Sequence, residues 1–230
     1  MSALRVLVVA ATRPEVAPLI AKLVNAAGHN QVVTGAIGSH KIDVLLTGVG
    51  MVATAVWCTR ALAIGGYDVA LNLGVCGSFN ASLAPPHVVH VTSDRLPELG
   101  VEDGPRFLSL QDIGLLGPDD FPFTGGRLGN DAPPALPGLS DLPTANGITV
   151  NTVHGHEPSI AAVVDRCRPD VESMEGAAFM YACLAAGVPF AQVRAVSNRV
   201  ERRNRDTWDL PGAITELGRV SLRLLGHAGS

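Results

Sequence analysis

Two carboxylates flank a methionine in the stretch "VESMEGAAF". Glu172 and Glu175 stand on either side of Met174, and three small residues follow. A carboxylate can accept two hydrogen bonds at once, which suits a vicinal diol such as a ribose 2′,3′ pair. The alternative is structural, because Glu175 falls at the expected first turn of a helix, where the helix dipole favours a negative charge. The residue types alone leave both interpretations open.

A serine and an amide follow a strand-like run near the end of the chain. "FAQVRAV" leads through Ser197 and Asn198 into the charged stretch "RVERRNRDTWD". In open α/β sheets, ligands bind outside the carboxyl ends of the strands. The pair therefore has two interpretations: an amide placed in a binding site, or an ordinary solvated loop before a last helix.

Glycines mark two further strand ends. Gly74 and Gly77 bracket "GVCG", and glycines there clear Cβ atoms from a concave surface and free backbone amides. The turn "TGVGMVATA" also fits the dinucleotide pattern G-x-G-x-x-A. That pattern requires an acidic residue at the end of the next strand, whereas Asp68 begins it. A nicotinamide site is therefore disfavoured, and close packing of helix and strand explains Gly48 and Gly50 equally well.

Other chemistries have weaker support. "VHGHE" offers His154 and His156 without a third ligand at metal-site spacing, so we expect a polar loop and a helix start with no metal. "GVCGS" lacks the G-x-S-x-G elbow of serine hydrolases, so Cys76 is expected in a wall. No C-x-x-C pair occurs, and we expect reduced, buried thiols at Cys58, Cys76, Cys167 and Cys183.

Apolar runs of strand length alternate with segments of helical period. The runs are continuous, which indicates strands covered on both faces, and the alternation indicates an α/β fold. We expect a three-layer sandwich with a central mixed, largely parallel twisted sheet flanked by helices. The expected strands cover residues 4–10, 42–47, 69–73, 87–92, 148–150 and 190–196, and the expected helices cover 14–27, 50–64, 157–167, 175–186 and 208–225.

Length and composition narrow the class of protein. A chain of 230 residues fits a single domain over residues 1–230. Residues 93–146 are rich in Pro, Gly and Asp, and such an irregular segment often serves as a lid or an interface. The net charge of −4 shows no basic stripe for nucleic acid. With no membrane-length apolar run and a start typical of a first strand, we expect a cytoplasmic protein that binds neither nucleic acid nor membrane.

Five motifs occur in one order along nearly the whole chain outside residues 93–146. They are "VVAATRPEV" at 8–16, "TGVGMVATA" at 47–55, "NLGVCGSF" at 72–79, "VESMEGAAF" at 171–179 and "RAVSNRVERRNRDTWDLPGAI" at 194–214. Together they resemble the nucleoside phosphorylase/nucleosidase family, and within it most closely the members that hydrolyse futalosine. The resemblance implies cleavage of the N-glycosidic bond of futalosine in menaquinone biosynthesis, with release of hypoxanthine and no cofactor.

The resemblance also implies roles for particular residues. Glu15 stands where the hydrolases of the family keep a glutamate that orients or deprotonates water. Met174 and Glu175 match the pair that packs under the ribose and binds its hydroxyls, and Val153 matches the segment that packs over the base. The expected catalytic residues are thus Glu15 and Asn198, and the expected substrate-binding residues are Met174, Glu175, Ser197, Gly74, Gly77 and Val153.

Position 198 departs from the adenine-specific pattern of the family. Ser197 and Asn198 match a Ser-Asp pair whose Asp protonates the leaving base. A neutral amide offers an acceptor to a protonated imidazole nitrogen and a donor to a 6-oxygen, which hypoxanthine presents. A buried polar site that leaves the wrong partner unpaired discriminates strongly. Asn198 should therefore disfavour 6-amino nucleosides.

Water is favoured over phosphate as the second substrate. Arg13 stands two residues before Glu15, but a carboxylate so close would repel phosphate, and no phosphorylase-like "GDPxR" occurs. The alternatives left open are a nucleosidase or phosphorylase for other 6-oxopurine nucleosides such as inosine, a nucleoside-binding protein without turnover, and a nicotinamide-dependent oxidoreductase.

The charged stretch after Asn198 supplies arginines near the expected site. Futalosine carries a benzoate beyond its ribose, and one of these guanidinium groups could pair with its carboxylate. Most are expected to pair with the surface acids Glu201, Asp206 and Asp209 instead. The resemblance further implies a homodimer or higher homo-oligomer with neighbouring chains near the site. The candidate arginines are Arg199, Arg202, Arg203 and Arg205.

Overall fold

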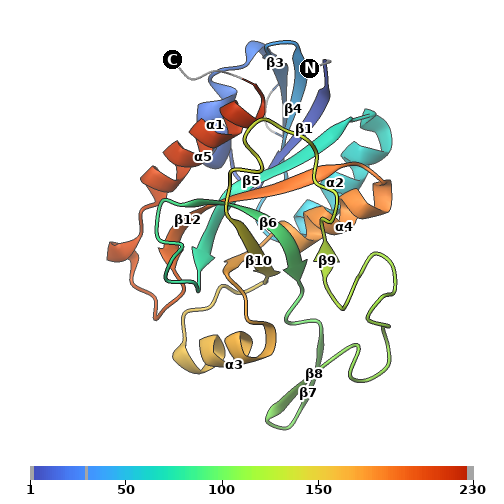
Figure 1. Ribbon diagram of the computed structural model, residues 1–230, viewed down its shortest axis with the longest axis vertical. Helices are drawn as coiled ribbons and strands as arrows, with labels where there is room; N and C mark the ends of the chain where they lie inside the picture. Colours follow the sequence, from blue (N-terminus) through green and yellow to red (C-terminus); the bar gives the residue numbers. More distant parts are fainter. Residues whose placement is uncertain (1–2, 29–30, 227–230) are drawn as a thin grey trace.

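One mixed sheet forms the centre of the molecule in the computed structural model, which describes residues 3–28 and 31–226 (Figure 1). Its strands follow the order β11-β10-β6-β12-β5-β1-β4-β3-β2, with β9 paired to β6. The strands are β1 (Arg5–Ala10), β2 (Val24–Ala27), β3 (Val32–Ile37), β4 (His40–Leu46), β5 (Val69–Ser78), β6 (Val88–Arg95), β9 (Leu128–Gly129), β10 (Thr144–Thr149), β11 (Val171–Ser173) and β12 (Phe190–Arg199).

Helices cover both faces of this sheet. α1 and α5 lie together on one face, and α2 and α4 pack against each other on the other (Figure 1). α3 is placed near β10, away from these two layers. The helices are α1 (Arg13–Ile20), α2 (Met51–Gly65), α3 (Glu157–Cys167), α4 (Gly176–Ala186) and α5 (Leu210–Leu224), with a short 3-10 turn η1 (Arg205–Thr207).

Strand β1 shows why the apolar runs of the sequence are continuous. Val6 and Val8 join the core under α1 and α5, whereas Leu7 and Val9 join the core under α2 and α4. Successive side chains of a strand point to opposite faces, so a strand buried on both sides needs apolar residues at every position. The expected three-layer architecture with a mixed sheet is confirmed.

The parallel strands bring several carboxyl ends to one edge. β4, β1, β5 and β12 run parallel to one another, while β4 runs antiparallel to β3 and β12 runs antiparallel to β6. The pairing of β12 with β5 shifts between Val196 and Asn198, so that Ser197 is an extra residue in the ladder. Such bulges re-aim side chains and are frequent beside active sites. The bulge lies where the sequence placed its candidate amide.

The expected helix over residues 14–27 is wrong in its second half. α1 ends at Ile20, and Val24–Ala27 form β2, which pairs antiparallel with β3. Asn25 has a φ of 54°, which interrupts a right-handed helix. The segment has helical spacing in sequence, but pairing with β3, itself not expected, determines its structure.

Residues 93–146 contain short elements within irregular chain. They include the end of β6, a hairpin of β7 (Gly100–Asp103) and β8 (Arg106–Ser109), and β9.

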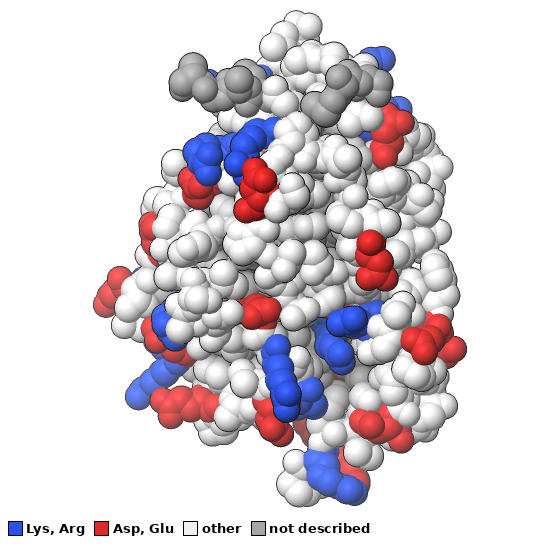
Figure 2. Space-filling view, in the orientation of Figure 1, with Lys and Arg blue, Asp and Glu red and all other residues white. Residues whose placement is uncertain are grey.

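On the face shown in Figure 2, acidic and basic side chains alternate around a broad uncharged area without a continuous basic stripe. Among the described residues, no helix has the length and apolar character needed to cross a membrane.

Candidate active site

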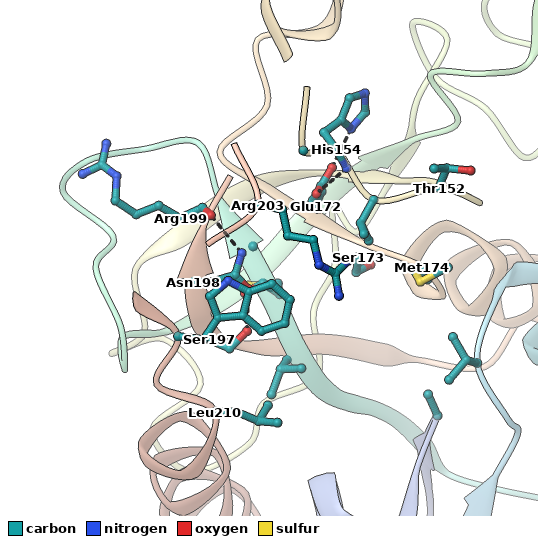
Figure 3. A pocket seen from close by; sticks show the side chains of 18 of the residues that line it. Thr152, His154, Glu172, Ser173, Met174, Ser197, Asn198, Arg199, Arg203 and Leu210 are labelled. Atoms are coloured by element: carbon teal, nitrogen blue, oxygen red, sulfur yellow. Dashed lines mark hydrogen bonds and ion pairs between the residues drawn. The ribbon is translucent and has the colours of Figure 1, made fainter. Parts of the chain in front are cut away.

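A cavity of about 870 Å³ opens where β1, β5, β11 and β12 end (Figure 3). Its volume falls within the range of small-molecule sites. It brings together residues that are distant in sequence. Seven of the eight predicted site residues line it, namely Glu15, Gly77, Val153, Met174, Glu175, Ser197 and Asn198, whereas Gly74 does not.

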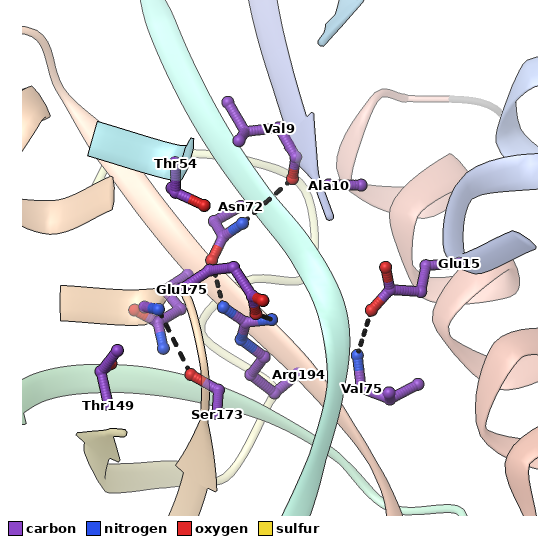
Figure 4. A network of polar contacts seen from close by, with 12 residues as sticks. Val9, Ala10, Glu15, Thr54, Asn72, Val75, Thr149, Ser173, Glu175 and Arg194 are labelled. Carbon is purple, nitrogen blue, oxygen red and sulfur yellow. Dashed lines mark hydrogen bonds and ion pairs between the residues drawn. The ribbon is translucent and has the colours of Figure 1, made fainter. Parts of the chain in front are cut away.

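Glu15 is fixed between α1 and β5. It belongs to the first turn of α1, and one of its oxygens, Oε2, accepts hydrogen bonds from the backbone N–H and the hydroxyl of Thr12, both at 2.8 Å. Oε1 accepts a bond from the Val75 N–H at 3.2 Å (Figure 4). Only 8% of Glu15 is exposed. The carboxylate therefore faces the cavity in one defined orientation.

Glu175 is held by a glycine turn and a buried arginine. Its Oε1 accepts a 3.0 Å bond from the Gly50 N–H, and its Oε2 lies 3.6 Å from Arg194 Nη1. Gly50 has a φ of 100°, a region that favours glycine. Arg194, 1% exposed, also donates from Nη2 to Asn72, which donates in turn to the Val9 carbonyl (Figure 4). This chain of contacts anchors Glu175 to β5 and β12.

Gly74 and Gly77 provide space for polar side chains. A Cβ on Gly74 would lie 2.2 Å from Arg194 Nη1 and 3.0 Å from Glu15 Oε1. A Cβ on Gly77 would lie 2.8 Å from Val200 and 3.4 Å from Asn198 Nδ2. Gly74 thus lies behind the wall, where it lets a guanidinium cross the strand, while Gly77 lies beside the amide in the wall.

Ser197 and Asn198 form one hydrogen-bonded unit. The Ser197 hydroxyl lies 3.2 Å from the Cys76 carbonyl and 2.9 Å from Asn198 Oδ1. Asn198 Nδ2 donates to the Arg199 carbonyl at 2.9 Å (Figure 3). A carbonyl only accepts, so this bond fixes which end of the amide is the NH₂. Each end of the amide keeps one further hydrogen-bonding position.

Glu172 binds His154 in the cavity wall through two contacts. Glu172 Oε1 accepts from the His154 backbone N–H at 3.1 Å, and Oε2 lies 2.7 Å from its Nδ1. The carboxylate therefore places the ring proton on Nδ1. His156 precedes the first residue of α3. The described residues contain no group of three or more His, Cys, Asp or Glu side chains that could hold a metal ion.

Cys76 lies in the wall as a buried thiol. Burial raises its pKa to about 12, so it stays protonated at neutral pH. A thiol is a weak nucleophile unless ionised. The cysteines are free, and three of the four are buried, with Cys167 partly exposed.

A buried aspartate supports the start of α4, directly after Glu175. Asp94 Oδ1 accepts from the Thr149 hydroxyl at 3.0 Å, and that hydroxyl oxygen accepts from the Ala177 N–H at 2.7 Å. Asp94 Oδ2 accepts from Gln192 Nε2 at 3.1 Å. Burial raises the pKa of Asp94 to about 6, against the lowering effect of these bonds. The network fixes the first turn of α4 from below.

Several of these supporting residues were not identified as site residues from the sequence. Arg194 and Asn72 interrupt the apolar runs "FAQVRAV" and "LNLG", and Asp94 follows "VVHVTS". A polar or charged residue inside a buried strand needs a partner. That rule, applied to neighbouring strands, was the available signal for the Arg194–Asn72 contact.

The expected pairing of the loop arginines with nearby acids is wrong. In the described part of the chain, no ion pair involves Arg199, Arg202, Arg203 or Arg205. Asp209 instead caps α5 by accepting from the Gly212 N–H, and Glu201 accepts from the Thr207 hydroxyl. Asp209 is thus occupied by a backbone donor of α5, and Glu201 lies beside a hydroxyl of its own loop.

Comparison with known proteins identifies the family. The family model described as "Phosphorylase superfamily" matches residues 5–225, nearly the whole chain. The chain belongs to the phosphorylase superfamily.

Relatives within this superfamily include proteins named futalosine hydrolase. The one from Thermus thermophilus is 31% identical over 194 residues, which cover 80% of this chain and 81% of the relative. A Helicobacter pylori futalosine hydrolase mutant has the same fold, with a TM-score of 0.80 at 15% identity over 98% of this chain and all of the other. A 5′-methylthioadenosine/S-adenosylhomocysteine nucleosidase from Colwellia psychrerythraea, solved with adenine, gives 0.81 at 22% identity over 98% and 96%.

Proposed function

We propose that this chain hydrolyses the N-glycosidic bond of futalosine and releases hypoxanthine and dehypoxanthine futalosine. The observation that carries the proposal is the arrangement of one cavity: Glu15 and Glu175 are fixed separately by backbone donors, with the amide of Asn198 in the same wall. The similarity to relatives named futalosine hydrolase supports the same reaction.

Asn198 is assigned to the base. Its Oδ1 accepts from Ser197 and has a second lone pair, and its Nδ2 donates to the Arg199 carbonyl and has a second hydrogen. A hypoxanthine protonated at its imidazole nitrogen offers an N–H to the first and a 6-oxygen to the second. An adenine ring would present its amino group to the amide NH₂, and two donors would face each other. The site therefore favours the 6-oxopurine.

The ribose is assigned to Met174 and Glu175. Gly50 and Arg194 hold the Glu175 carboxylate, which leaves acceptor positions for the sugar hydroxyls. Cleavage creates positive character at C1′, as in glycoside hydrolysis. Carboxylates on both sides of the sugar stabilise that charge, and they are fixed before the substrate arrives.

Glu15 is assigned to the water. It takes a proton from a water molecule whose oxygen forms the new bond to C1′, while the bond from C1′ to the base nitrogen breaks. The electron pair of that bond leaves with the base, which takes up a proton from solvent at its imidazole nitrogen. The N–H so formed donates to Asn198 Oδ1, an interaction stronger in the transition state than in the bound substrate.

The placement of Arg13 supports water over phosphate. Arg13 begins α1 and is exposed, and it is not among the residues that line the cavity. At the part of the cavity beside α1, the charged group in the wall is Glu15, and its carboxylate repels a phosphate anion. Hydrolysis is therefore favoured over phosphorolysis.

Base release from three substrates tests this function. Futalosine, inosine and methylthioadenosine are incubated separately with the protein, with and without phosphate, and the free base is quantified by chromatography. We expect hypoxanthine from futalosine at a rate that phosphate does not change, and little adenine from methylthioadenosine. Cleavage of inosine only when phosphate is present would overturn the proposal in favour of a phosphorylase.

We also propose that the chain acts as a homo-oligomer. The exposed Val52 and Val56 on α2 support this, because they extend an apolar surface from Val49 at the rim of the cavity. Light scattering coupled to size-exclusion chromatography measures the mass directly. A mass of 23.9 kDa at working concentration would contradict it.

A further inference from the structure

Two arginines in the cavity wall take part in no ion pair with any acid that the structure describes. Arg199 and Arg203 both line the cavity, and neither takes part in an ion pair among the described residues. A cation at the wall of a ligand cavity without a counter-charge attracts an anion. The two arginines are therefore the candidates for contact with a negatively charged part of a ligand.

The acidic residues of the same wall are already engaged. Glu15 accepts from Thr12 and Val75, and Glu172 accepts from His154. Glu175 contacts Gly50 and Arg194, and Glu98 contacts Asn151. Glu201 lies 3.4 Å from the Thr207 hydroxyl, whose nearer acceptor is the Asn204 carbonyl at 3.0 Å. None of these five carboxylates forms an ion pair with Arg199 or Arg203 in the described chain.

The side-chain positions distinguish Arg203 from Arg199. In Figure 3 the side chain of Arg203 extends over the pocket on the side of Ser173, whereas that of Arg199 is directed outward. Arg203 Cζ lies 5.6 Å from the ring centroid of Trp208. Its Cβ is close to Gly155, since a Cβ added to that glycine would lie 3.6 Å from it. A cation–π contact at this distance holds the guanidinium beside the indole and leaves its N–H groups for a carboxylate.

The cavity has room beyond a purine and a ribose. Its volume of about 870 Å³ lies toward the upper end of the range for small-molecule sites. Asn198 and Glu175 take the base and the sugar in the proposed function, and the same cavity is also lined by Trp208, Leu210 and Ile214. An apolar surface beside a cation suits an aromatic ring that bears a carboxylate.

We propose that Arg203 is the specificity-determining residue that binds the carboxylate of the benzoate group of the substrate. The assignment rests on the proposed function, since futalosine supplies that benzoate. It predicts that the enzyme distinguishes futalosine from a neutral analogue through this one side chain. Trp208 acts as a positioning residue, because it orients the guanidinium.

The test compares futalosine with its methyl ester, which lacks the negative charge. Initial rates of hypoxanthine release are measured on both for the wild type, Arg203→Ala, Arg199→Ala and Arg202→Ala. Arg202 is the matched control, because it lies in the same loop, is exposed and does not line the cavity. We expect Arg203→Ala to lower kcat/KM for futalosine about fivefold, the upper size for the ion pair of an exposed arginine, and to leave the ester unchanged.

The outcomes separate this assignment from the function itself. If the wild type releases no hypoxanthine from futalosine, the proposed function fails and takes the assignment with it. If the wild type is active, but Arg203→Ala lowers both substrates equally or neither, the assignment of Arg203 is overturned and the function stands. A charge-selective loss in Arg199→Ala or Arg202→Ala, with none in Arg203→Ala, overturns it as well.

Discussion

The cavity has two unlike sides. On one side, Glu15 and Glu175 stand at helix starts, with Arg194 in the middle of β12 behind them; all three are at most 8% exposed and are held by backbone N–H groups or by one another. On the other side, the end of β12 and the connection to α5, which contains η1, carry arginines that are exposed and lack ion pairs in the described chain. The first side suits bond breaking, which needs groups fixed in advance, and the second suits selection of a ligand.

The largest expected effect is on the fixed side. Glu15→Gln keeps the shape and one acceptor but removes the base, so kcat should fall about 10²- to 10⁴-fold while KM changes little. Steady-state hypoxanthine release measures both constants. Glu98→Gln is the control, because Glu98 lines the same cavity but contacts Asn151. An increase in KM with unchanged kcat would mean that Glu15 serves binding instead.

Removing the buried cation should reduce stability. Arg194→Met leaves Glu175 in the interior without its positive partner, and breaking such a pair costs about 3 to 5 kcal/mol in the free energy of unfolding. Urea unfolding followed by circular dichroism provides the value. Arg199→Met, a change at an exposed position, should alter it by less than about 0.5 kcal/mol. Equal stability of the two variants would show that both sides of the cavity tolerate loss of charge alike.

The amide at the junction of the two sides should control base preference. Asn198→Asp removes the donor to a 6-oxygen and brings a carboxylate against the Arg199 carbonyl. We expect kcat/KM for futalosine to fall about tenfold or more relative to methylthioadenosine. Asn204→Asp is the control, because Asn204 lines the cavity and its side-chain oxygen accepts from the Asp206 N–H, which a carboxylate can also do. An unchanged ratio for Asn198→Asp would contradict the assignment of the base.

The smallest effect concerns the support beneath α4. Burial raises the pKa of Asp94 in the folded protein from 3.8 to about 6, so the folded state keeps a proton that the unfolded chain has released. The free energy of unfolding should therefore fall as pH rises from about 4 to about 6, and Asp94→Asn should lack that part of the fall. Urea titrations at half-unit pH intervals measure the difference. Parallel curves for both proteins would show that Asp94 is ionised throughout.

The fixed side was more readily predicted from sequence than the loop side. Continuous apolar runs located β1, β5 and β12, and parallel strands bring their carboxyl ends together, so Glu15, Gly77 and Asn198 could be expected near one another. The contact of Arg194 with Glu175 could not, because it depends on how β12 and the start of α4 lie beside each other in three dimensions. The partners of the loop acids were predicted wrongly, since a backbone N–H binds Asp209 and a threonine hydroxyl lies beside Glu201 where arginines were expected.

The hydrogen bonds of Glu15 have one more consequence. An ionised carboxylate has about four lone-pair positions, and Thr12 and Val75 already fill three of those on Glu15. A single position remains for a hydrogen from outside the chain. Glu15 can therefore align one water molecule at a time. A sugar hydroxyl that bound to Glu15 would displace this water and slow the reaction.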